Sequence, residues 1–518
     1  MFGIFDLEFK LDKSELSSKL GIEINTEDSV GIYFFADKLI AIDNLIFCFD
    51  GVIYNFKKLN KLLEDAINNI DDDEVLEKLK SNIIDLDLNL ESETFYINPK
   101  SDFHVLANLI YYYYVLTDDL LAAVNSSINL IDGDYAFTLY DGLNLAISRD
   151  EVGVKPLFCG LNRETGVKAF SSDKKTLWKI GVLDEDIYDL KPGDIIYNWK
   201  TYENKESLLN QALELDLIDY DKEYENYDEY LKTKESYDMY KDLLFSNLIE
   251  SVYKCINGLD KVGLIFSGGV DSSILAIILK EIAIQKEKSG ELFDFKLFSV
   301  GLENSQDIKF SKKIANDLDL ELEEIIINED IIRRYLKDVL IAIEDPNIMK
   351  LGVGMTIFIA SKFMAGEGYN IALAGQGADE LFGGYNRYLK HFEENDLSSA
   401  YFGLDAEIRH DIENMYHVNL ERDNACTIAN GVELRSPFLD KRLIKSVRVL
   451  DDEPLNEMAY PTNFSLEEFT NQKSFAAKIR YCNERLQKLG SGSSRIANGP
   501  PALANQELVA LLRLALKK

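Results

Sequence analysis

A short stretch after an apolar run offers the clearest chemistry in the sequence. Leu264–Phe266 is followed by Ser267, Gly268, Gly269, Val270, Asp271 and Ser272, and an apolar helical pattern comes next. Glycines have no Cβ, so an anion can approach the backbone N–H groups, and the following helix directs its positive end at the same point. The serine hydroxyls add donors, and the aspartate adds a carboxylate that suits Mg²⁺ beside phosphates. The stretch predicts a phosphate site, with an ordinary tight turn as the alternative.

A second glycine loop follows a later apolar run. Ile371–Leu373 leads into Ala374, Gly375, Gln376, Gly377, Ala378, Asp379 and Glu380. Taken alone, the two carboxylates would be a helix N-terminal cap. In parallel sheets, however, ligands bind at the carboxyl ends of the strands. We therefore expect both loops, and Val300–Gly301 at the end of a third run, to line one crevice where Asp271 and Asp379 share magnesium on a polyphosphate.

The elements that must position these loops alternate between strand and helix. From residue 243 onward, strand-like runs at 261–266, 295–302, 322–328 and 369–375 are separated by helical patterns, which predicts βαβ units and a parallel sheet. Residues 1–197 instead show short strand-like runs with turns. A segment rich in Tyr, Glu, Asp and Lys over 198–242 is expected to be a charged linker. We thus expect domains at 1–197 and 243–518.

Composition restricts the partners. The 518 residues carry a formal net charge of −34, which argues against nucleic acid and anionic membranes as partners. The start of the chain has no signal-peptide pattern and no run of ~20 apolar residues is present, so we expect a cytoplasmic protein without a membrane span. The five cysteines and four histidines show no disulfide or metal-ligand spacing.

Four motifs of the second half, in order, resemble one family. SGGVDSS, FSVGL, AGQGADELFGGY and GVELRSPFLDKRLI are similar to the synthetase domain of glutamine-dependent asparagine synthetases. The resemblance implies a parallel-sheet ATP pyrophosphatase fold. It continues more weakly in DGVIYN, SDFHV, GDYAFTLYD, SRDEVGVKPLF, AFSSDKKTL and LKPGDIIY. These resemble the family's glutaminase domain, an antiparallel β-sandwich with helices of the αββα, N-terminal-nucleophile type.

The resemblance implies a two-step reaction with ATP and Mg²⁺. Aspartate would attack the α-phosphate to give β-aspartyl-AMP and pyrophosphate, and ammonia would then displace AMP to give asparagine. Ser267–Ser272 would hold the pyrophosphate portion, and Val300–Gly301 would meet the adenosine. Ala374 and Gly375 would contact the nucleotide through the backbone. In-line displacement at phosphorus needs positioning and electrostatics, which such loops supply.

The first half departs from the glutaminase pattern. The family begins Met-Cys-Gly-Ile with a nucleophilic Cys, whereas this sequence reads Met1-Phe2-Gly3-Ile4. The family's Asn-Gly-Glu, which holds glutamine, is here Asp50-Gly51-Val52, and only Asp102 stands where expected. Cys48 is not expected to replace the nucleophile because nothing in the pattern gives it an adjacent base. We therefore expect a degenerate glutamine site of Asp50, Gly51 and Asp102 that has lost its activity.

The second half departs at fewer positions. The family often has Ser-Gly-Glu-Gly where this chain has Ala374-Gly375-Gln376-Gly377, and Gln376 can orient a substrate but takes no proton near neutral pH. Lys473, with Lys478 as a second candidate, is expected to reach the phosphates. Arg435 is expected to have a structural role, with a substrate-facing charge as the alternative. The Ala- and Leu-rich last thirty residues differ in character from the rest, as a frame change in the gene would produce.

Three hypotheses follow. The first is an amide-forming ligase of the asparagine synthetase type that uses free ammonia or ammonia from another protein, as a homodimer. The second is another acyl-adenylating amide synthetase, of the β-lactam synthetase type, in which an amine-containing substrate occupies the emptied glutaminase side. The third is a nucleotide-binding regulatory pseudoenzyme. Site completeness rather than fold alone puts the first hypothesis ahead of the other two, which stand equal.

Overall fold

The computed structural model describes residues 1–5, 20, 32–84, 86–89, 94–97, 101–204, 234–392 and 397–448. The chain folds into two compact units, Met1–Gln211 and Ala212–Lys518. The domain limits expected from sequence stay a prediction. Within the expected linker 198–242, β13 (Lys200–Tyr202) belongs to a sheet of the first unit, and α9 (Lys234–Ile256) begins in the second.

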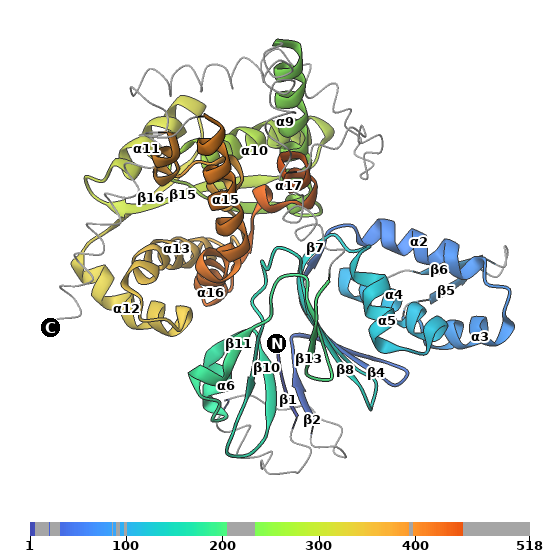
Figure 1. The fold of residues 1–518 in the computed structure, drawn as a ribbon. Helices are drawn as coiled ribbons and strands as arrows, with labels where there is room; N and C mark the ends of the chain where they lie inside the picture. Colours follow the sequence, from blue (N-terminus) through green and yellow to red (C-terminus); the bar gives the residue numbers. More distant parts are fainter. Residues whose placement is uncertain are drawn as a thin grey trace. The chain divides into compact units, whose positions relative to one another are not determined.

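Two antiparallel sheets build the first unit (Figure 1). One has the order β11 (Ile187–Asp189), β9 (Phe158–Leu161), β10 (Lys168–Ser171), β1 (Phe2–Phe5) and β2 (Ile32–Phe35). The other has the order β13, β12 (Ile195–Tyr197), β8 (Leu145–Arg149), β7 (Gly133–Tyr140), β4 (Leu45–Ile53) and β3 (Lys38–Ile42). A separate hairpin joins β5 (Leu86–Asn89) and β6 (Thr94–Ile97). The antiparallel β architecture that the resemblance implies for this part of the chain is confirmed.

Helices cover the outer faces of these sheets. Leu59, Leu63 and Ile67 recur at every fourth residue of α2 (Phe56–Asn68), so one helical face is buried against the second sheet. The other helices on that side are α3 (Asp73–Asn82), α4 (Asp102–Thr117) and α5 (Leu120–Ile128). On the first sheet, α6 (Lys174–Lys179) buries Leu177. A third cluster, which includes Phe5, Cys48 and Phe170, combines residues of both sheets.

A five-stranded parallel sheet is the centre of the second unit. Its order is β16 (Leu322–Ile327), β15 (Asp294–Leu302), β14 (Lys261–Ile265), β17 (Ile371–Leu373) and β18 (Glu433–Arg435). The parallel sheet expected from the strand–helix alternation is confirmed, whereas β18 was not predicted. The chain moves from β14 to β15 and β16 in one direction and then returns to β17 on the other side of β14. This reversal makes the carboxyl ends of β14 and β17 a topological switch point, where ligands bind in such sheets.

The connections of this sheet are mostly helical (Figure 1). The helices between the strands are α10 (Val270–Ser289), α11 (Gln306–Leu318), α12 (Glu329–Ile343) and α13 (Ile348–Gly366). After β17 come α14 (Ala378–Phe382), the 3₁₀ segment η2 (Asn386–Phe392), α15 (Leu397–Met415), the π-helical turn η3 (Tyr416–Leu420) and α16 (Glu421–Ile428). The 3₁₀ turn η4 (Pro437–Leu439) and α17 (Lys441–Arg448) follow β18.

Helix α13 is long and apolar enough to cross a membrane by length and composition alone. Its mean hydropathy is 1.5 over the most apolar window, and 56% of that window is buried inside the protein. Met355, Ile359 and Met364 of α13 belong to the core cluster that joins the helix to α12, α16 and the parallel sheet. These contacts account for its apolar composition as a core helix.

Candidate active site

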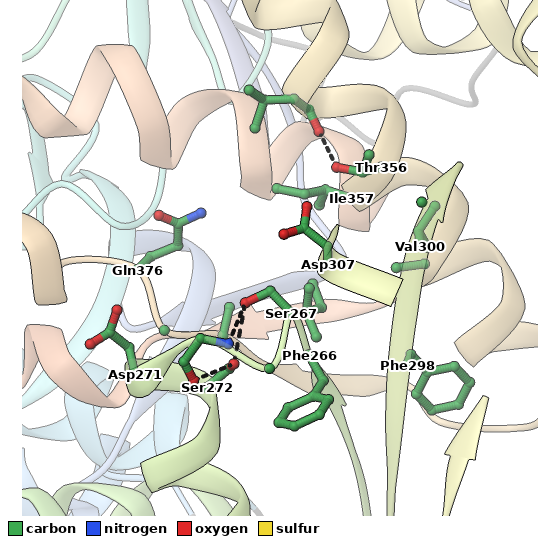
Figure 2. A pocket seen from close by; sticks show the side chains of 18 of the residues that line it. Phe266, Ser267, Asp271, Ser272, Phe298, Val300, Asp307, Thr356, Ile357 and Gln376 are labelled. Carbon is green, nitrogen blue, oxygen red and sulfur yellow. Dashed lines mark hydrogen bonds between the residues drawn. The ribbon is translucent and has the colours of Figure 1, made fainter. Parts of the chain in front are cut away.

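The first glycine loop leaves β14 and begins α10 directly. Gly268 has φ +73°, and a Cβ built on it would lie 2.6 Å from the backbone nitrogen of Ser311 in α11. Only glycine fits, because both the backbone conformation and the close packing exclude a side chain. The Gly269 N–H donates to Ser267 Oγ at 3.2 Å, and Ser267 Oγ lies 3.3 Å from Ser272 Oγ (Figure 2). Hydroxyls and backbone amides thus gather at the N-terminus of a 20-residue helix.

The second glycine loop comes close to the first at the switch point. A Cβ on Gly375 would lie 3.2 Å from the Cβ of Asp271, so the two loops touch. Together they line a cavity of about 430 Å³. It contains every site residue expected in this unit except Lys473: Phe266, Ser267, Gly268, Gly269, Asp271, Ser272, Val300, Gly301, Ala374, Gly375, Gln376 and Asp379. The structure therefore brings these residues together, whereas Lys473 and Lys478 lie outside the described residues.

Two carboxylates of this cavity are destabilised in their charged form. Burial raises the pKa of Asp271 to about 6, with a further contribution from the negative charge of Glu380. Burial, followed by repulsion from Asp271 and Glu380, raises the pKa of Asp379 to about 7. A cation between them would relieve this repulsion. No group of three His, Cys, Asp or Glu residues with metal-ligand geometry occurs in the described part of the chain.

A pair of carboxylates nevertheless fits magnesium. Mg²⁺ is commonly held by one or two carboxylates together with substrate phosphates, because it keeps several of its waters. Asp271 and Asp379 are the residues that would hold it, and it would neutralise phosphate charge during displacement at phosphorus.

Among the lining residues that sequence reasoning missed, four carry a carboxyl, phenol, amide or guanidinium group: Asp307, Tyr385, Asn419 and Arg422. Arg422, at the start of α16, lines the cavity and its Nε donates to Asp423 Oδ1 at 2.7 Å. Tyr385 and Asn419 also line it, and both donate to Glu380 Oε1, at 2.6 and 2.7 Å. None of these three directly follows a strand, so the rule that ligands bind at strand ends does not find them.

Asp307, in the first turn of α11, is the fourth. Its side chain lies on the cavity wall together with Val300, Thr356 and Ile357 (Figure 2). Burial raises its pKa to about 6. The sequence could have indicated this residue, since Asp307 is a carboxylate in the connection that follows the predicted strand end at Val300–Gly301, six residues after Gly301.

Arg435 has the structural role expected of it. Its Nη1 donates to the backbone carbonyl of Cys255 at 2.5 Å, and its Nε donates to Glu433 at 2.8 Å. It is not among the residues that line the cavity.

In the first unit, a lysine lies between two residues of the expected glutamine site. Lys38 Nζ donates to the Gly51 carbonyl at 2.7 Å and lies 3.9 Å from Asp102 Oδ1. The other oxygen of Asp102 accepts from the Ile53 N–H at 2.7 Å. The ammonium group of Lys38 is therefore a cationic neighbour of both residues.

Asp50, the third residue of that expected site, also has hydrogen-bonding and charged neighbours. Asp50 accepts a hydrogen bond from Ser172 Oγ at 3.1 Å. Burial alone would raise the pKa of Asp50, but Lys155 and other positive groups bring it below its ordinary value. The nearby Cys48 is fully buried, and this burial raises the pKa of its thiol to about 12. Such a thiol carries almost no thiolate at neutral pH.

Comparisons with known proteins point to the same family as the sequence motifs. The family model described as asparagine synthase matches residues 244–402 and 390–454, and the one described as a glutamine amidotransferase domain matches residues 81–179. The putative asparagine synthetase (glutamine-hydrolyzing) 1 of Methanocaldococcus jannaschii is 35% identical over 373 residues, which are 69% of this chain and 62% of that protein. Asparagine synthetase B (glutamine-hydrolyzing) of Escherichia coli is 27% identical over 321 residues, covering 61% and 53%.

Among solved structures, glutamine phosphoribosylpyrophosphate amidotransferase from B. subtilis aligns with 12% identity and a TM-score of 0.28, over 62% of this chain and 80% of that one. A similarity that low supports no conclusion about this chain. The chain spans less than two thirds of the length of the two curated relatives above. It carries the synthetase and amidotransferase domain matches, and by these matches it belongs to the asparagine synthetase family.

Proposed function

We propose that this protein is an ATP-dependent, amide-forming ligase of the asparagine synthetase type. It would convert aspartate, ATP and ammonia to asparagine, AMP and pyrophosphate through β-aspartyl-AMP. The observation that carries the proposal is the joint cavity of the two glycine loops, which combines backbone amides, serine hydroxyls and the carboxylates of Asp271 and Asp379. A polyphosphate with magnesium suits this combination, since the amides and hydroxyls donate to phosphate and the carboxylates accept the metal.

The residues have separate tasks in this reaction. Ser267, Gly269 and Ser272 hold the phosphates that become pyrophosphate, and Gly268 lets the backbone approach them. Val300 and Gly301 border the adenosine. Arg422 is a cationic residue of the cavity wall and would meet the carboxylate substrate.

We also propose that the first unit has lost glutamine hydrolysis. Lys38 satisfies Gly51 and Asp102, and Asp50 is engaged by Ser172 and the positive charge of Lys155. The buried Cys48 thiol is not a nucleophile at neutral pH. Ammonia would therefore come from solution or from an ammonia-supplying protein. A homodimer in the cytoplasm remains part of the proposal.

One assay tests both statements. The purified full chain is incubated with MgATP and aspartate, and either ammonium or glutamine is added, while pyrophosphate, asparagine and glutamate are measured. We expect pyrophosphate and asparagine with ammonium, and neither asparagine nor glutamate with glutamine. Pyrophosphate with another carboxylate in place of aspartate would favour the β-lactam synthetase type. ATP binding without pyrophosphate from any carboxylate would favour the regulatory pseudoenzyme.

A further inference from the structure

The amide of Gln376 is held by a fully buried carboxylate. Its Nε2 donates to Asp423 Oδ2 in α16, and Asp423 has no exposed surface. The other oxygen of Asp423 accepts from Arg422 Nε at 2.7 Å. Gln376 and Asp423 are 47 positions apart in the sequence, so this contact depends on the packing of the β17 loop against α16.

This contact decides which end of the amide is available to the cavity. Burial raises the pKa of Asp423, and the charge and hydrogen bond of Arg422 oppose that rise. In its charged form Asp423 only accepts hydrogen bonds, so the NH₂ group of Gln376 then points at it. The carbonyl oxygen Oε1 is then the acceptor that Gln376 offers to a ligand in the cavity it lines (Figure 2). Within the described part of the chain, no hydrogen-bond donor reaches that oxygen.

The same contact makes a carboxylate unfavourable at position 376. A glutamate there would place two carboxylates at hydrogen-bond distance inside the protein, and one of them would have to hold a proton. Asp423 therefore selects an amide over an acid at this position.

We propose that Asp423 is a positioning residue that fixes Gln376, so that Gln376 Oε1 accepts a hydrogen bond from the amine that attacks the acyl-adenylate. The inference rests on the proposed function. In this step the C–N bond forms, the bond between the acyl carbon and the AMP oxygen breaks, and AMP leaves with the electron pair. The proton that the nitrogen gives up leaves on the AMP phosphate, because an amide oxygen does not take it near neutral pH.

The first test separates the two half-reactions. Asp423→Asn retains an oxygen for Arg422 but lets the Gln376 amide turn either way. We expect asparagine formation to fall about tenfold, the rate factor of one well-placed hydrogen bond. In a single turnover, with enzyme in excess over ATP, the rate of pyrophosphate release should change less than about twofold while the rate of asparagine formation falls. An equal fall in both single-turnover rates would show a merely structural role and overturn the proposal.

The second test needs no turnover. The free energy of unfolding is measured between pH 6 and 8 for the wild type, Gln376→Glu, Asp423→Asn and the double variant. We expect Gln376→Glu to lose stability as the pH rises. The double variant should lose much less, because the asparagine amide introduced at position 423 can donate to the carboxylate introduced at position 376. Burial raises the pKa values of the neighbouring Cys426 thiol and Tyr385 phenol still further above this window. Asp271 and Asp379 are present in all four proteins, and Asp423, whose pKa burial raises, is present in two of them. The effect of Gln376→Glu is therefore compared between the Asp423 and Asp423→Asn backgrounds.

Gln306→Glu provides the matched control, since Gln306 is an exposed amide on α11. The change in the free energy of unfolding caused by Gln306→Glu should be the same in the wild-type background and in the Asp423→Asn background. Equal pH dependence of Gln376→Glu in both backgrounds would overturn the pairing.

If the wild type releases no pyrophosphate with any carboxylate, the proposed function and the role toward the amine both fail. The unfolding measurements would still decide whether Asp423 selects the amide.

Discussion

At the scale of single residues, local backbone chemistry explains most of the cavity. The glycines, serines and Asp271 of the first loop were expected from their order alone, because only glycine lets an anion and a neighbouring helix approach the backbone so closely. Gly268 shows both requirements, with a positive φ and contact with the backbone of α11. Side chains that reach the cavity from other elements, such as Arg422 and Asn419, have no comparable local signature.

Gly268→Ala should abolish most of the activity. The new Cβ would collide with the backbone of Ser311 and displace the loop, and displacements near 1 Å at such sites reduce rates about a hundredfold. Pyrophosphate release with MgATP and aspartate measures this effect. Gly290→Ala is the matched control, because Gly290 has φ +80° but nothing within 4 Å of the added Cβ. Wild-type pyrophosphate release by Gly268→Ala would contradict the loop assignment.

Asp379→Asn should stabilise the ligand-free protein at high pH. The pKa of Asp379 is raised from 3.8 to about 7 in the folded state, so its contribution to stability is complete below pH ~4 and is lost as the pH rises through ~7. The variant stays neutral, and we expect a gain on the order of 1–2 kcal/mol at pH 8 and none at pH 4. Urea denaturation without magnesium measures it.

Asp319→Asn, at an exposed carboxylate, serves as the control for Asp379→Asn and should keep the pH dependence of the wild type. An unchanged pH dependence in Asp379→Asn would show that Asp379 is not strained by its neighbours.

At the scale of elements, the sheet order brings the two loops together. The alternation of strands and helices predicted a parallel sheet, and the strand order places β14 beside β17 at the switch point. Two of the missed residues come from the segment after α15, where the π-helical turn η3 carries Asn419 and α16 carries Arg422. A π-helical turn often marks a functional site, but no residue pattern in the sequence announced this one.

A buried ion pair joins α9 to the start of α17. Lys254 Nζ donates to Asp440, and both side chains are at least nine-tenths buried. Lys254→Met should destabilise the protein by about 3–5 kcal/mol, because it leaves the Asp440 charge buried. Adding Asp440→Asn, which can still accept from the Arg442 N–H, should recover part of that loss. Chemical denaturation gives both values, and a double variant no more stable than Lys254→Met would contradict the ion-pair explanation.

At the scale of the whole molecule, self-repulsion is the dominant electrostatic property. A formal net charge of −34 on 518 residues disfavours the compact state at low ionic strength. Raising the salt concentration from about 0.01 to about 0.15 M shortens the Debye length from about 30 to about 8 Å and screens this repulsion.

The melting temperature should therefore rise with salt. A gain of about 1 kcal/mol corresponds to about 2–4 °C in a domain of about 150–250 residues. Calorimetry in sodium chloride and in choline chloride measures the rise, and the two salts should act alike because screening depends on ionic strength. A rise with only one cation would indicate a specific ion site instead.

The sequence by itself determined the parallel sheet, the glycine loops and the carboxylates that follow strands, since these depend on local backbone geometry and strand periodicity. The antiparallel type of the first domain came from the resemblance of its motifs to a family. Only the tertiary structure decided what the side chains contact. Lys38 meets Gly51 and Asp102, and Gln376 meets Asp423, because packing brings together elements that are far apart in the chain. The same packing raises the pKa values of Asp271 and Asp379, because desolvation and repulsion depend on neighbours that sequence order does not reveal.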